Sequence, residues 1–542
     1  MLEDKKIERQ AAAPPKKFVC KKIKKGYSRR AFFHKICAIC ERDKFARARS
    51  SYFRGSFSVF RLLFSVYNGC MHIYFMGICG TAMGNAALLM RELGHVVSGS
   101  DTGIYPPMSD LLHAQGIKIR EGYSAEKLLA EHPDLVVVGN VVSRGHPEIE
   151  WLLESRAFPI VSLPELLRTQ LLCRRHNIVV AGTHGKTTTS TLAAFLLKEA
   201  GEEPGWLIGG VPRDLPMGAH ASVDASPFVI EGDEYDTAFF DKRSKFIQYM
   251  PEILLLNNLE FDHADIFRDL QDVQRTFSHV IRLVPRSGYI VANGDDENIA
   301  PLLETVTWCP IIRVGVGENC DVRIYDFKET PTGSTFRLTW KGREWTTVNW
   351  KQSGIFNARN AAMAGTAAAL YQNGKRSEWE FSLDALSKFE GVKRRREILV
   401  DKPALTAIED FGHHPTALRL TLEALRERYP YHKIVAAFEP RSNTAVRKIM
   451  QDAFTEALSK ADAALLAPVH HASQGAEKMN TAEVAGTLIA QGKQALAATD
   501  NEQILNALID EAKIASRERP TLVVFFSNGA FGGIIKRFTE SV

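Results

Sequence analysis

Short apolar runs that end in polar or glycine-containing loops recur along this chain from residue 71 onward, and they constrain its fold more than any other feature. Helical patterns separate these runs. Alternation of this kind predicts a parallel sheet with helices on its faces. The runs fall into three series, which begin near residues 71, 177 and 393. We therefore expect an α/β protein of three domains, each with a mostly parallel sheet flanked by helices.

The expected domain boundaries are residues 71–172, 173–392 and 393–542, after a basic extension over residues 1–70. The extension carries 18 Lys and Arg against 5 Asp and Glu, whereas the whole chain has a net charge of +5. The remainder is therefore acidic, so we expect no nucleic-acid partner. The apolar runs of the extension are too short for a membrane span, and no secretory signal is evident. We interpret the extension as disordered, or as lying upstream of the true start at Met71.

Cysteine usage predicts a reducing compartment. Cys37 and Cys40 form a CxxC in the extension, but no second pair at zinc-like spacing accompanies them. Four further cysteines are scattered over the remaining chain, at positions Cys79, Cys173, Cys309 and Cys320. We expect free thiols and a cytoplasmic protein without membrane insertion.

The segment "AGTHGKTTTS", residues 181–190, follows an apolar run and predicts a phosphate-binding loop. Backbone N–H groups of such a loop and of the following helix point at the anion, and Lys186 would reach the outer phosphates. The usual motif has a further glycine where this chain has Val180. What remains, Gly182-x-x-Gly185-Lys186-Thr187, also matches a turn that only links a strand to a helix.

A helical pattern follows this loop. The leucines at positions 192, 196 and 197 fall on one helix face, and Gly201 stands where a helix would end. The segment therefore reads as strand, loop and helix, the arrangement that a triphosphate cradle requires.

Acidic residues follow the next two apolar runs of the second series. A triphosphate needs a divalent cation, for which we expect Mg²⁺, and Thr187 can offer its hydroxyl. "VIEGDEYD" places Glu231, Asp233, Glu234 and Asp236 at one strand tip, and "NNLEFDH" places Glu260, Asp262 and His263 at the next. Solvated loop charge is the competing interpretation of both clusters.

The first and third series also carry polar residues at strand ends, where open parallel sheets bind ligands. In the first series, a glycine turn at residues 77–84 suits a pyrophosphate, and Asp101 stands where an acidic residue would meet a ribose. A dinucleotide dehydrogenase and a turn needed only for packing both remain open. In the third series, Asp410 precedes "GHHP", and Arg394–Arg396 lie at the boundary with the second series. A structural turn and a solvated basic run are the alternatives there.

Taken together, these motifs resemble the Mur ligase family, ATP-dependent amide-forming enzymes of peptidoglycan synthesis, over some 470 residues from Met71. "GTHGKTTT" is similar to the family's ATP loop, in which the missing glycine is normal. "EGDEYD" and "NLEFDHADIF" are similar to its metal-binding stretches, "GIFNARNAAMA" to its adenine-contacting segment, and "GVKRRRE" to the arginine stretch that reaches ATP. "EDFGHHPT" resembles the muramate–alanine ligase branch.

The resemblance implies a role for individual residues. It implies ATP binding by Gly182, Thr183, His184, Gly185, Lys186, Thr187, Thr188, Asn357, Asn360 and Arg395. It implies a metal at Thr187, Glu231 and His263, and catalysis by Lys186, His263, Asp410 and His413. It implies UDP-sugar binding by Gly77, Cys79, Gly80, Thr81, Asp101 and Asn140. Some relatives use a carbamylated lysine at a second metal, but we assign none here.

Several segments favour the branch of the family that accepts a peptide during cell-wall recycling. They are "GICGTAMG", "GNVVSRGHPEIE", "EGDEYDTAFFDKRSKF", "FEPRSNT" and "FSNGAFGG". Phe356 also stands where alanine-adding enzymes commonly have histidine. The implied substrates are ATP, UDP-N-acetylmuramate and the murein tripeptide. Arg441 and Ser442, which follow a strand of the third series, are candidates for binding the peptide, although a surface arginine is nearly as common there.

Three other functions compete with this one. The nearest is the alanine-adding ligase, which runs the same reaction with a smaller amine. Folylpolyglutamate synthetase is a rival in the wider superfamily, disfavoured by the first glycine turn and by "GHHP". A non-catalytic nucleotide-binding module, or a regulator whose basic extension contacts nucleic acid, is the rival from a different class. Three separate strand-end clusters argue against that rival.

Overall fold

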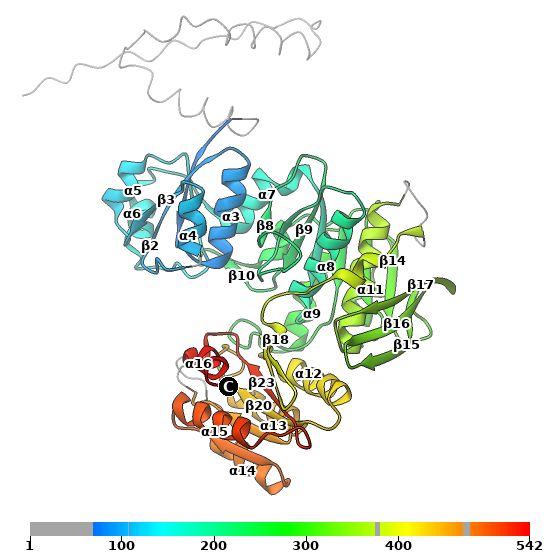
Figure 1. Cartoon of the computed structure of the whole chain (residues 1–542). Helices are drawn as coiled ribbons and strands as arrows, with labels where there is room; N and C mark the ends of the chain where they lie inside the picture. The colour runs from blue at the N-terminus through cyan, green and yellow to red at the C-terminus, as the bar shows by residue number, and fades with distance from the viewer. Residues whose placement is uncertain (1–68, 107, 374–379, 470–476) are drawn as a thin grey trace, which may run out of the picture. The chain divides into compact units, whose positions relative to one another are not determined.

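The computed structural model describes residues 69–106, 108–373, 380–469 and 477–542. The CxxC at Cys37 and Cys40 and nearly all of the basic extension lie outside these residues. Figure 1 shows strands and helices alternating along the described chain. Three α/β sheets confirm the expected fold class. Within the described residues, no helix is both long enough and apolar enough to cross a lipid bilayer.

The first sheet is fully parallel and has the order β3-β2-β1-β4-β5, with β1 at its centre. Because Met76 of β1 pairs with Ser100 of β2 and Val138 of β4, the loops after these three strands open at one edge. That edge is the switch point at which such sheets bind ligands. The strands are β1 (His72–Met76), β2 (Val96–Asp101), β3 (Lys118–Glu121), β4 (Leu135–Val138) and β5 (Ile160–Ser162). The helices are α3 (Thr81–Glu92), α4 (Met108–Ala114), α5 (Ala125–Glu131), α6 (Pro147–Ser155) and α7 (Leu163–Gln170).

The central sheet has ten strands in the order β17-β16-β15-β14-β13-β12-β6-β9-β7-β8. Ala181 of β6 pairs with Leu256 of β12 and Gly232 of β9, so the phosphate-loop segment and both acidic segments leave the sheet side by side. The strands are β6 (His176–Ala181), β7 (Gly205–Leu207), β8 (Ala219–His220), β9 (Pro227–Gly232), β12 (Ile253–Leu256), β13 (Tyr289–Asn293), β14 (Ile311–Gly315), β15 (Val322–Thr330), β16 (Gly333–Trp340) and β17 (Arg343–Trp350). The helices are α8 (Lys186–Glu199), α9 (Leu270–Ile281), α10 (Ala300–Leu303) and α11 (Ile355–Tyr371), and a separate hairpin comprises β10 (Asp236–Ala238) and β11 (Asp241–Ser244).

The core of the central sheet lies on both of its faces. Val180, which replaces the extra glycine of the usual phosphate-loop motif, is a fully buried residue of β6. On one face, α8 packs against α11, whose run of alanines allows the two helices to approach closely. The antiparallel strands β15 to β17 extend this sheet, and the strand-and-helix alternation did not predict them.

The third sheet has the order β18-β19-β23-β20-β21-β22, and only the edge strand β18 is antiparallel. Phe526 of β23 pairs with Asp410 of β19 and Phe438 of β20, so the loops after these strands also meet at one edge. The strands are β18 (Arg395–Lys402), β19 (Leu405–Asp410), β20 (Lys433–Phe438), β21 (Ala463–Leu466), β22 (Gln494–Ala497) and β23 (Thr521–Phe526). The helices are α12 (Pro415–Arg428), α13 (Gln451–Leu458), α14 (Thr481–Ala490), α15 (Asn501–Ile514) and α16 (Ile534–Ser541).

Candidate active site

The loop between β6 and α8 has the geometry of a phosphate cradle. Gly182 and Gly185 have φ values of 140° and 79°, which glycine adopts without strain. A Cβ at Gly185 would lie 2.9 Å from Oδ1 of Asn360, so the loop also needs glycine for space. Because Gly185 precedes α8 and has no side chain, the N–H groups of the first helical turn face the loop without a side-chain cap.

The second half of the cradle is held by a residue that the sequence analysis did not select. The backbone N–H of Thr183 donates to the carbonyl of Asn258 at 3.1 Å, and the N–H of His184 donates to the side-chain oxygen of the same residue at 2.7 Å. Asn258 follows β12, and two asparagines directly after an apolar run are the signal that could have found it. Thr188 lies within the first turn of α8.

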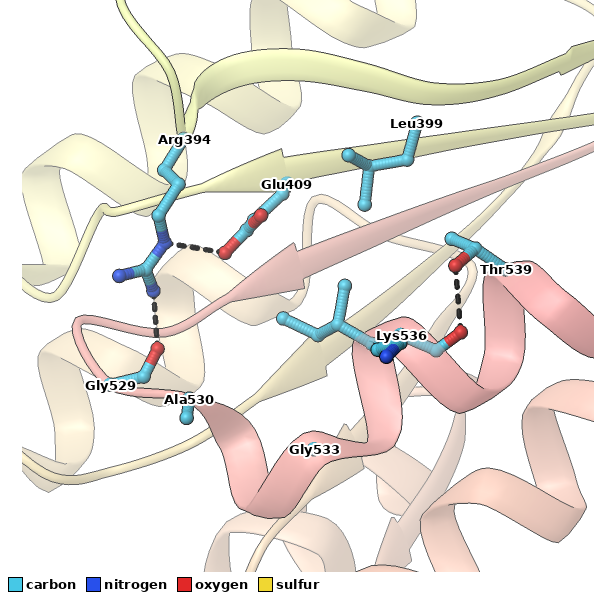
Figure 2. Close-up of a pocket in the computed structure, with 9 residues that line it drawn as sticks. Arg394, Leu399, Glu409, Gly529, Ala530, Gly533, Lys536 and Thr539 are labelled. Atoms are coloured by element: carbon cyan, nitrogen blue, oxygen red, sulfur yellow. Dashed lines mark hydrogen bonds and ion pairs between the residues drawn. The ribbon is translucent and has the colours of Figure 1, made fainter. Parts of the chain in front are cut away.

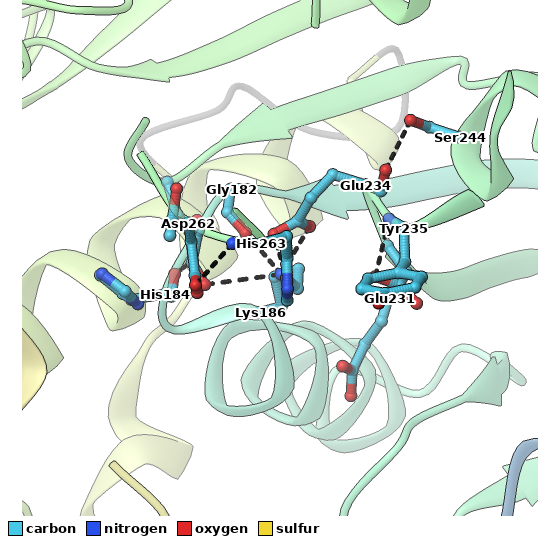
Figure 3. Close-up of polar contacts among 12 residues, drawn as sticks. Gly182, His184, Lys186, Glu231, Glu234, Tyr235, Ser244, Asp262 and His263 are labelled. Carbon is cyan, nitrogen blue, oxygen red and sulfur yellow. Dashed lines mark hydrogen bonds and ion pairs between the residues drawn. The ribbon is translucent and has the colours of Figure 1, made fainter. Parts of the chain in front are cut away.

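Lys186 is fixed at the mouth of this loop. Its Nζ donates to the carbonyl of Gly182 and to Oε2 of Glu234, both at 2.7 Å (Figure 3). Burial works to lower the pKa of Lys186, but Glu234 and Asp233 outweigh it and raise that pKa. The ammonium group is therefore charged and lies beside the loop. Glu234 lies at a strand tip that the sequence analysis identified, but its pairing with Lys186 was not foreseen.

Thr187, Glu231 and Arg395 meet beside this pair. The Thr187 hydroxyl donates to Oε2 of Glu231 at 3.2 Å, and the Arg395 guanidinium donates to the same hydroxyl at 3.4 Å. The other oxygen of Glu231 accepts from the backbone N–H of Gly209 at 2.7 Å. Burial raises the pKa of Glu231 and makes a cation beside it more favourable. These contacts bring together two of the three expected metal ligands, with an arginine from the start of the third sheet.

His263, the third expected ligand, lies against Glu234 rather than against Glu231. Its Nε2 lies 3.3 Å from Oε1 of Glu234, and its backbone N–H donates to the hydroxyl of Thr444 at 3.0 Å (Figure 3). The backbone of His263 is left-handed, with φ of 53°, a conformation that is uncommon for residues other than glycine. Burial works to lower the pKa of His263, but Glu234 outweighs it and raises that pKa.

Asp410 and His413 stand at the edge of the third sheet. The carboxylate of Asp410 accepts from the backbone N–H groups of Gly412 at 2.7 Å and Arg396 at 3.0 Å, so it shapes this loop. Nδ1 of His413 lies 3.1 Å from the carbonyl of Phe411. Burial lowers the pKa of His413 to about 4, which leaves the ring neutral near pH 7.

The two asparagines expected near adenine form a buried pair on α11. The side-chain amide of Asn360 donates to Oδ1 of Asn357 at 3.1 Å, and the Asn357 amide donates to the carbonyl of Ser353 at 3.1 Å. Because Asn360 also lies close to Gly185, this pair connects α11 to the phosphate loop.

The expected UDP-sugar residues gather at the switch point of the first sheet. Asp101 accepts from the backbone N–H groups of Cys79 at 2.7 Å and Gly103 at 2.8 Å, so one carboxylate oxygen holds the glycine turn and the other holds the loop after β2. Its contact with a ribose stays a prediction. The other members of the set follow β1 or β4, at Gly77, Gly80, Thr81 and Asn140. The Cys79 side chain is a free thiol whose pKa burial raises to about 11.

Arg441 and Ser442 follow β20 at the edge of the third sheet. The Arg441 side chain is 59% exposed, and its Nη1 lies 4.0 Å from Oε1 of Glu439. The Ser442 hydroxyl accepts from the backbone N–H of Ala445 at 3.0 Å. A Cβ at Gly529 would lie 2.7 Å from Arg441, so glycine there leaves room for the arginine.

A cavity of about 570 Å³ lies next to these residues in the third sheet, and Gly529 lines it (Figure 2). Arg394 also lines it, pairs with Glu409 at 2.5 Å and donates to the carbonyl of Gly529. Lys536 lines the opposite side. The walls therefore offer two cations and one carboxylate beside apolar surface.

Comparison with known families and proteins gives a consistent result. Three family models match the chain: "Mur ligase family, catalytic domain" over residues 72–174, "Mur ligase middle domain" over 180–368, and "Mur ligase, glutamate ligase domain" over 394–529. UDP-N-acetylmuramate–L-alanyl-γ-D-glutamyl-meso-2,6-diaminoheptandioate ligase of Escherichia coli strain K12 is 39% identical over 474 residues, which are 87% of this chain and 98% of that protein.

Two further relatives separate the branches. The crystal structure of a murein peptide ligase from Psychrobacter arcticus has a TM-score of 0.64 and 36% identity, over 87% of this chain and 98% of that one. A UDP-N-acetylmuramate–L-alanine ligase from Pediococcus pentosaceus is 33% identical over 73% of this chain and 84% of that protein. Similarity is thus higher, and extends further, toward ligases that take a peptide.

Proposed function

Because this chain belongs to the Mur ligase family, we propose that it joins the carboxylate of UDP-N-acetylmuramate to the amine of L-alanyl-γ-D-glutamyl-meso-diaminopimelate, at the expense of ATP. The phosphate cradle closed by Lys186 and flanked by Thr187 and Glu231 carries this proposal. The 39% identity to a peptide-accepting ligase over 87% of the chain supports the choice of amine. The reaction belongs to peptidoglycan recycling, and the alanine-adding ligase is the alternative.

Activation of the carboxylate explains the need for ATP. A carboxylate does not react with an amine directly, because its leaving group would be oxide. Transfer of the γ-phosphoryl group breaks the P–O bond to ADP and forms an acyl phosphate. The amine then attacks the acyl carbon, the C–O bond to phosphate breaks, and the amide forms with loss of one proton from nitrogen. Lys186 would stabilise the charge on the phosphoryl group as it moves.

The donor atoms of the site fit Mg²⁺. The hydroxyl of Thr187 and the carboxylate of Glu231 are oxygen ligands that converge beside the loop, and oxygen is the donor that Mg²⁺ prefers. When bound, Mg²⁺ would neutralise charge on the phosphates. His263 is a weaker match, because its ring faces Glu234. We keep it as a proposed ligand of a second metal.

His413 is the group that we propose takes the proton of the attacking amine. Its Nδ1 faces the carbonyl of Phe411, so Nδ1 carries the ring proton and Nε2 keeps a lone pair. Burial keeps the ring neutral near pH 7, with a pKa of about 4. Asp410 would act by holding the loop that carries His413.

The peptide would bind at the edge of the third sheet. Arg441 and Ser442 stand beside the cavity that is lined by Arg394, Glu409 and Lys536. A tripeptide ending in diaminopimelate presents several carboxylates and a distant ammonium group, to which two cations and one carboxylate are complementary. We likewise propose that the domains span residues 71–172, 173–392 and 393–542.

One assay tests the proposed function. Phosphate release from ATP is measured with UDP-N-acetylmuramate and, in parallel, L-alanine, the tripeptide, the corresponding tetrapeptide, or no amine. We expect turnover that requires both UDP-N-acetylmuramate and the peptide. Preference for L-alanine would establish the alternative, and turnover independent of UDP-N-acetylmuramate would remove both ligase assignments.

Loss of a metal ligand should change the Mg²⁺ requirement. We expect Glu231→Gln and His263→Ala each to raise the Mg²⁺ concentration for half-maximal activity by at least about 10-fold, since even changes to outer partners of a metal typically cost 10–100-fold. Asp224→Asn, at a carboxylate that is 63% exposed, is the matched control. Unchanged magnesium dependence in both variants would show that Glu231 and His263 are solvated charged residues of loops and do not bind the metal.

Deletion of residues 1–70 should leave the kinetic constants unchanged. The first strand begins at His72, and the backbone N–H of Met71 contacts Nδ1 of His95 at 3.3 Å. The expected result is equal kcat and KM values for the full chain and the shortened one. A folded deletion with markedly altered kinetics would make the extension part of the enzyme.

A further inference from the structure

Three side chains to which the proposed reaction assigns no chemical step converge where the phosphate loop, the loop after β12 and the start of α12 meet. They are His184, Glu260 and His414, each of which offers a ligand atom, and these atoms all lie within 4.8 Å of one another. Oε2 of Glu260 lies 3.6 Å from Nε2 of His184 and 3.4 Å from Nδ1 of His414. In Figure 3 the His184 ring lies apart from the contacts of Glu234 with Lys186 and His263.

Both imidazoles present a buried nitrogen that has no hydrogen-bond partner among the described residues. These atoms are Nε2 of His184 and Nδ1 of His414. His414 as a whole is only 4% exposed. Leaving a buried polar atom unsatisfied destabilises the folded chain. Two such atoms aimed at one carboxylate oxygen therefore indicate that something else satisfies them.

The tautomer of His414 identifies what is missing. Its Nε2 lies 3.3 Å from the carbonyl of Phe261, so Nε2 must carry the proton and Nδ1 must carry the lone pair. A lone pair therefore faces the Glu260 carboxylate, whose Oε2 also accepts from the hydroxyl of Thr416 at 2.6 Å. A cation between the lone pair and the carboxylate would satisfy both groups.

We propose that His184, Glu260 and His414 bind a zinc-like divalent cation, distinct from the magnesium of the reaction. Two imidazoles and one carboxylate are a zinc donor set, whereas Mg²⁺ prefers oxygen. Tetrahedral ligands at about 2.0–2.1 Å from zinc lie roughly 3.3 Å from one another. The separations of 3.4 and 3.6 Å from Glu260 agree with that spacing.

The surroundings of the three side chains give an ion access to the site, and a bound ion would connect two parts of the fold. A cavity of about 260 Å³, lined by Glu260, His414, Thr416 and Arg419 among others, opens beside two of the three ligands and leaves room for a fourth. His184 directly precedes Gly185 of the phosphate loop, and His414 directly precedes α12. The bound ion therefore ties the tip of the phosphate loop to the first helix of the third sheet.

Cobalt binding by the full-length protein tests the site without measuring turnover. Chelator-treated protein in saturating Mg²⁺ is titrated with Co²⁺, whose visible absorption reports imidazole coordination, and Zn²⁺ is then added as a competitor. We expect one Co²⁺ per chain, displaced by Zn²⁺. Glu260→Gln and His414→Gln should each weaken binding by at least about 100-fold, because each removes a direct ligand.

Two controls make this result specific. His113→Gln changes an exposed histidine of α4, and His263→Ala changes the histidine of the proposed magnesium site; both should keep the cobalt band. Thermal unfolding with and without Zn²⁺ gives a second measurement, since ligand binding raises Tm in the wild type but should not in Glu260→Gln. Circular dichroism confirms that the variants fold.

Three outcomes overturn the proposal. The first is a wild-type protein that shows neither a cobalt band nor a Zn²⁺-dependent rise in Tm. The second is an equal band in wild type and Glu260→Gln, the substitution that keeps the size of the side chain. The third is a band lost in His263→Ala but kept in Glu260→Gln, which assigns the cobalt to the magnesium site.

Discussion

Lys186→Ala should lower the rate of ligation by at least about 100- to 1000-fold. The substitution removes the cation that we propose lies nearest the transferring phosphoryl group, and loss of one such charge-stabilising contact typically costs about 3 kcal/mol or more of barrier. The measurement is phosphate release in saturating ATP, UDP-N-acetylmuramate and tripeptide. A folded variant that keeps most of its activity would contradict the role of Lys186 in ATP turnover.

The structure adds a consequence for stability. Lys186 and Glu234 form a buried pair, with side chains 16% and 4% exposed, so Lys186→Ala leaves the carboxylate without its cation. Breaking such a pair typically costs about 3–5 kcal/mol. We therefore expect a lower Tm in Lys186→Ala and a partial recovery in Lys186→Ala/Glu234→Gln, which removes the unpaired charge. Activity should not return in the double variant, and this separates the catalytic effect from the loss of stability.

Lys245→Ala is the matched control for these variants. Lys245 pairs with Asp233 at 2.5 Å, at the same strand tip as Glu234. Burial works to raise the pKa of Asp233, but Lys245 and Lys186 outweigh it and lower that pKa to about 2. Because Lys245 lies outside the phosphate loop, its loss should leave a much larger share of the activity. An equal loss in both variants would indicate that any change of charge at this tip disrupts the site.

Arg441→Ala should raise the KM for the tripeptide by roughly 10- to 100-fold. A charged hydrogen bond of about 1.5–3 kcal/mol corresponds to that range, and arginine makes forked contacts with carboxylates. The side chain is 59% exposed, and its nearest acid, Glu439, is 4.0 Å away, so the guanidinium is accessible to a substrate. The measurement is initial rate against tripeptide concentration, at saturating ATP and UDP-N-acetylmuramate.

The KM values for ATP and UDP-N-acetylmuramate should barely change in Arg441→Ala. Arg441→Lys keeps the positive charge but cannot make the two-pronged contact of a guanidinium with a carboxylate. Its KM for the tripeptide should therefore lie between the values of wild type and Arg441→Ala. Arg517→Ala, at an exposed arginine of the same part of the chain, should behave as wild type. Loss of ATP affinity in Arg441→Ala would mean that Arg441 is misassigned. A wild-type preference for L-alanine would replace the recycling function with the alanine-adding one.

The sequence alone predicted the local elements that carry the proposed site. The glycine loop and the helix after it follow from Gly182, Gly185 and a leucine face, and α8 runs from Lys186 to Glu199 as that pattern requires. Gly201, expected to end this helix, has a left-handed φ of 85°. Such features depend on backbone preferences and periodicity within a few residues, which a sequence displays directly.

Contacts between distant segments required the tertiary structure. Glu234 pairs with a lysine 48 positions earlier in the chain, and His263 turns to this carboxylate instead of joining Glu231. The antiparallel strands β15 to β17 extend a sheet that the alternating pattern had left mostly parallel. In each case the contact partner depends on the order of the strands in the sheet and on which loops lie next to each other at its edge. The hydrophobic pattern specifies neither the strand order nor the neighbouring loops.

The cluster of His184, Glu260 and His414 shows the same division. Each residue lies in a sequence motif: His184 in "GTHGKTTT", Glu260 in "NLEFDHADIF" and His414 in "EDFGHHPT". The residue types in these motifs predicted that all three are loops at the ends of strands. Their meeting depends on the pairing of β6 with β12 and on the packing of α12 against the loops that follow those strands. Sequence therefore determined which chemical groups stand at the strand ends. Tertiary structure decided which of them share a site, because only the packed chain brings residues up to 230 positions apart within ligand distance.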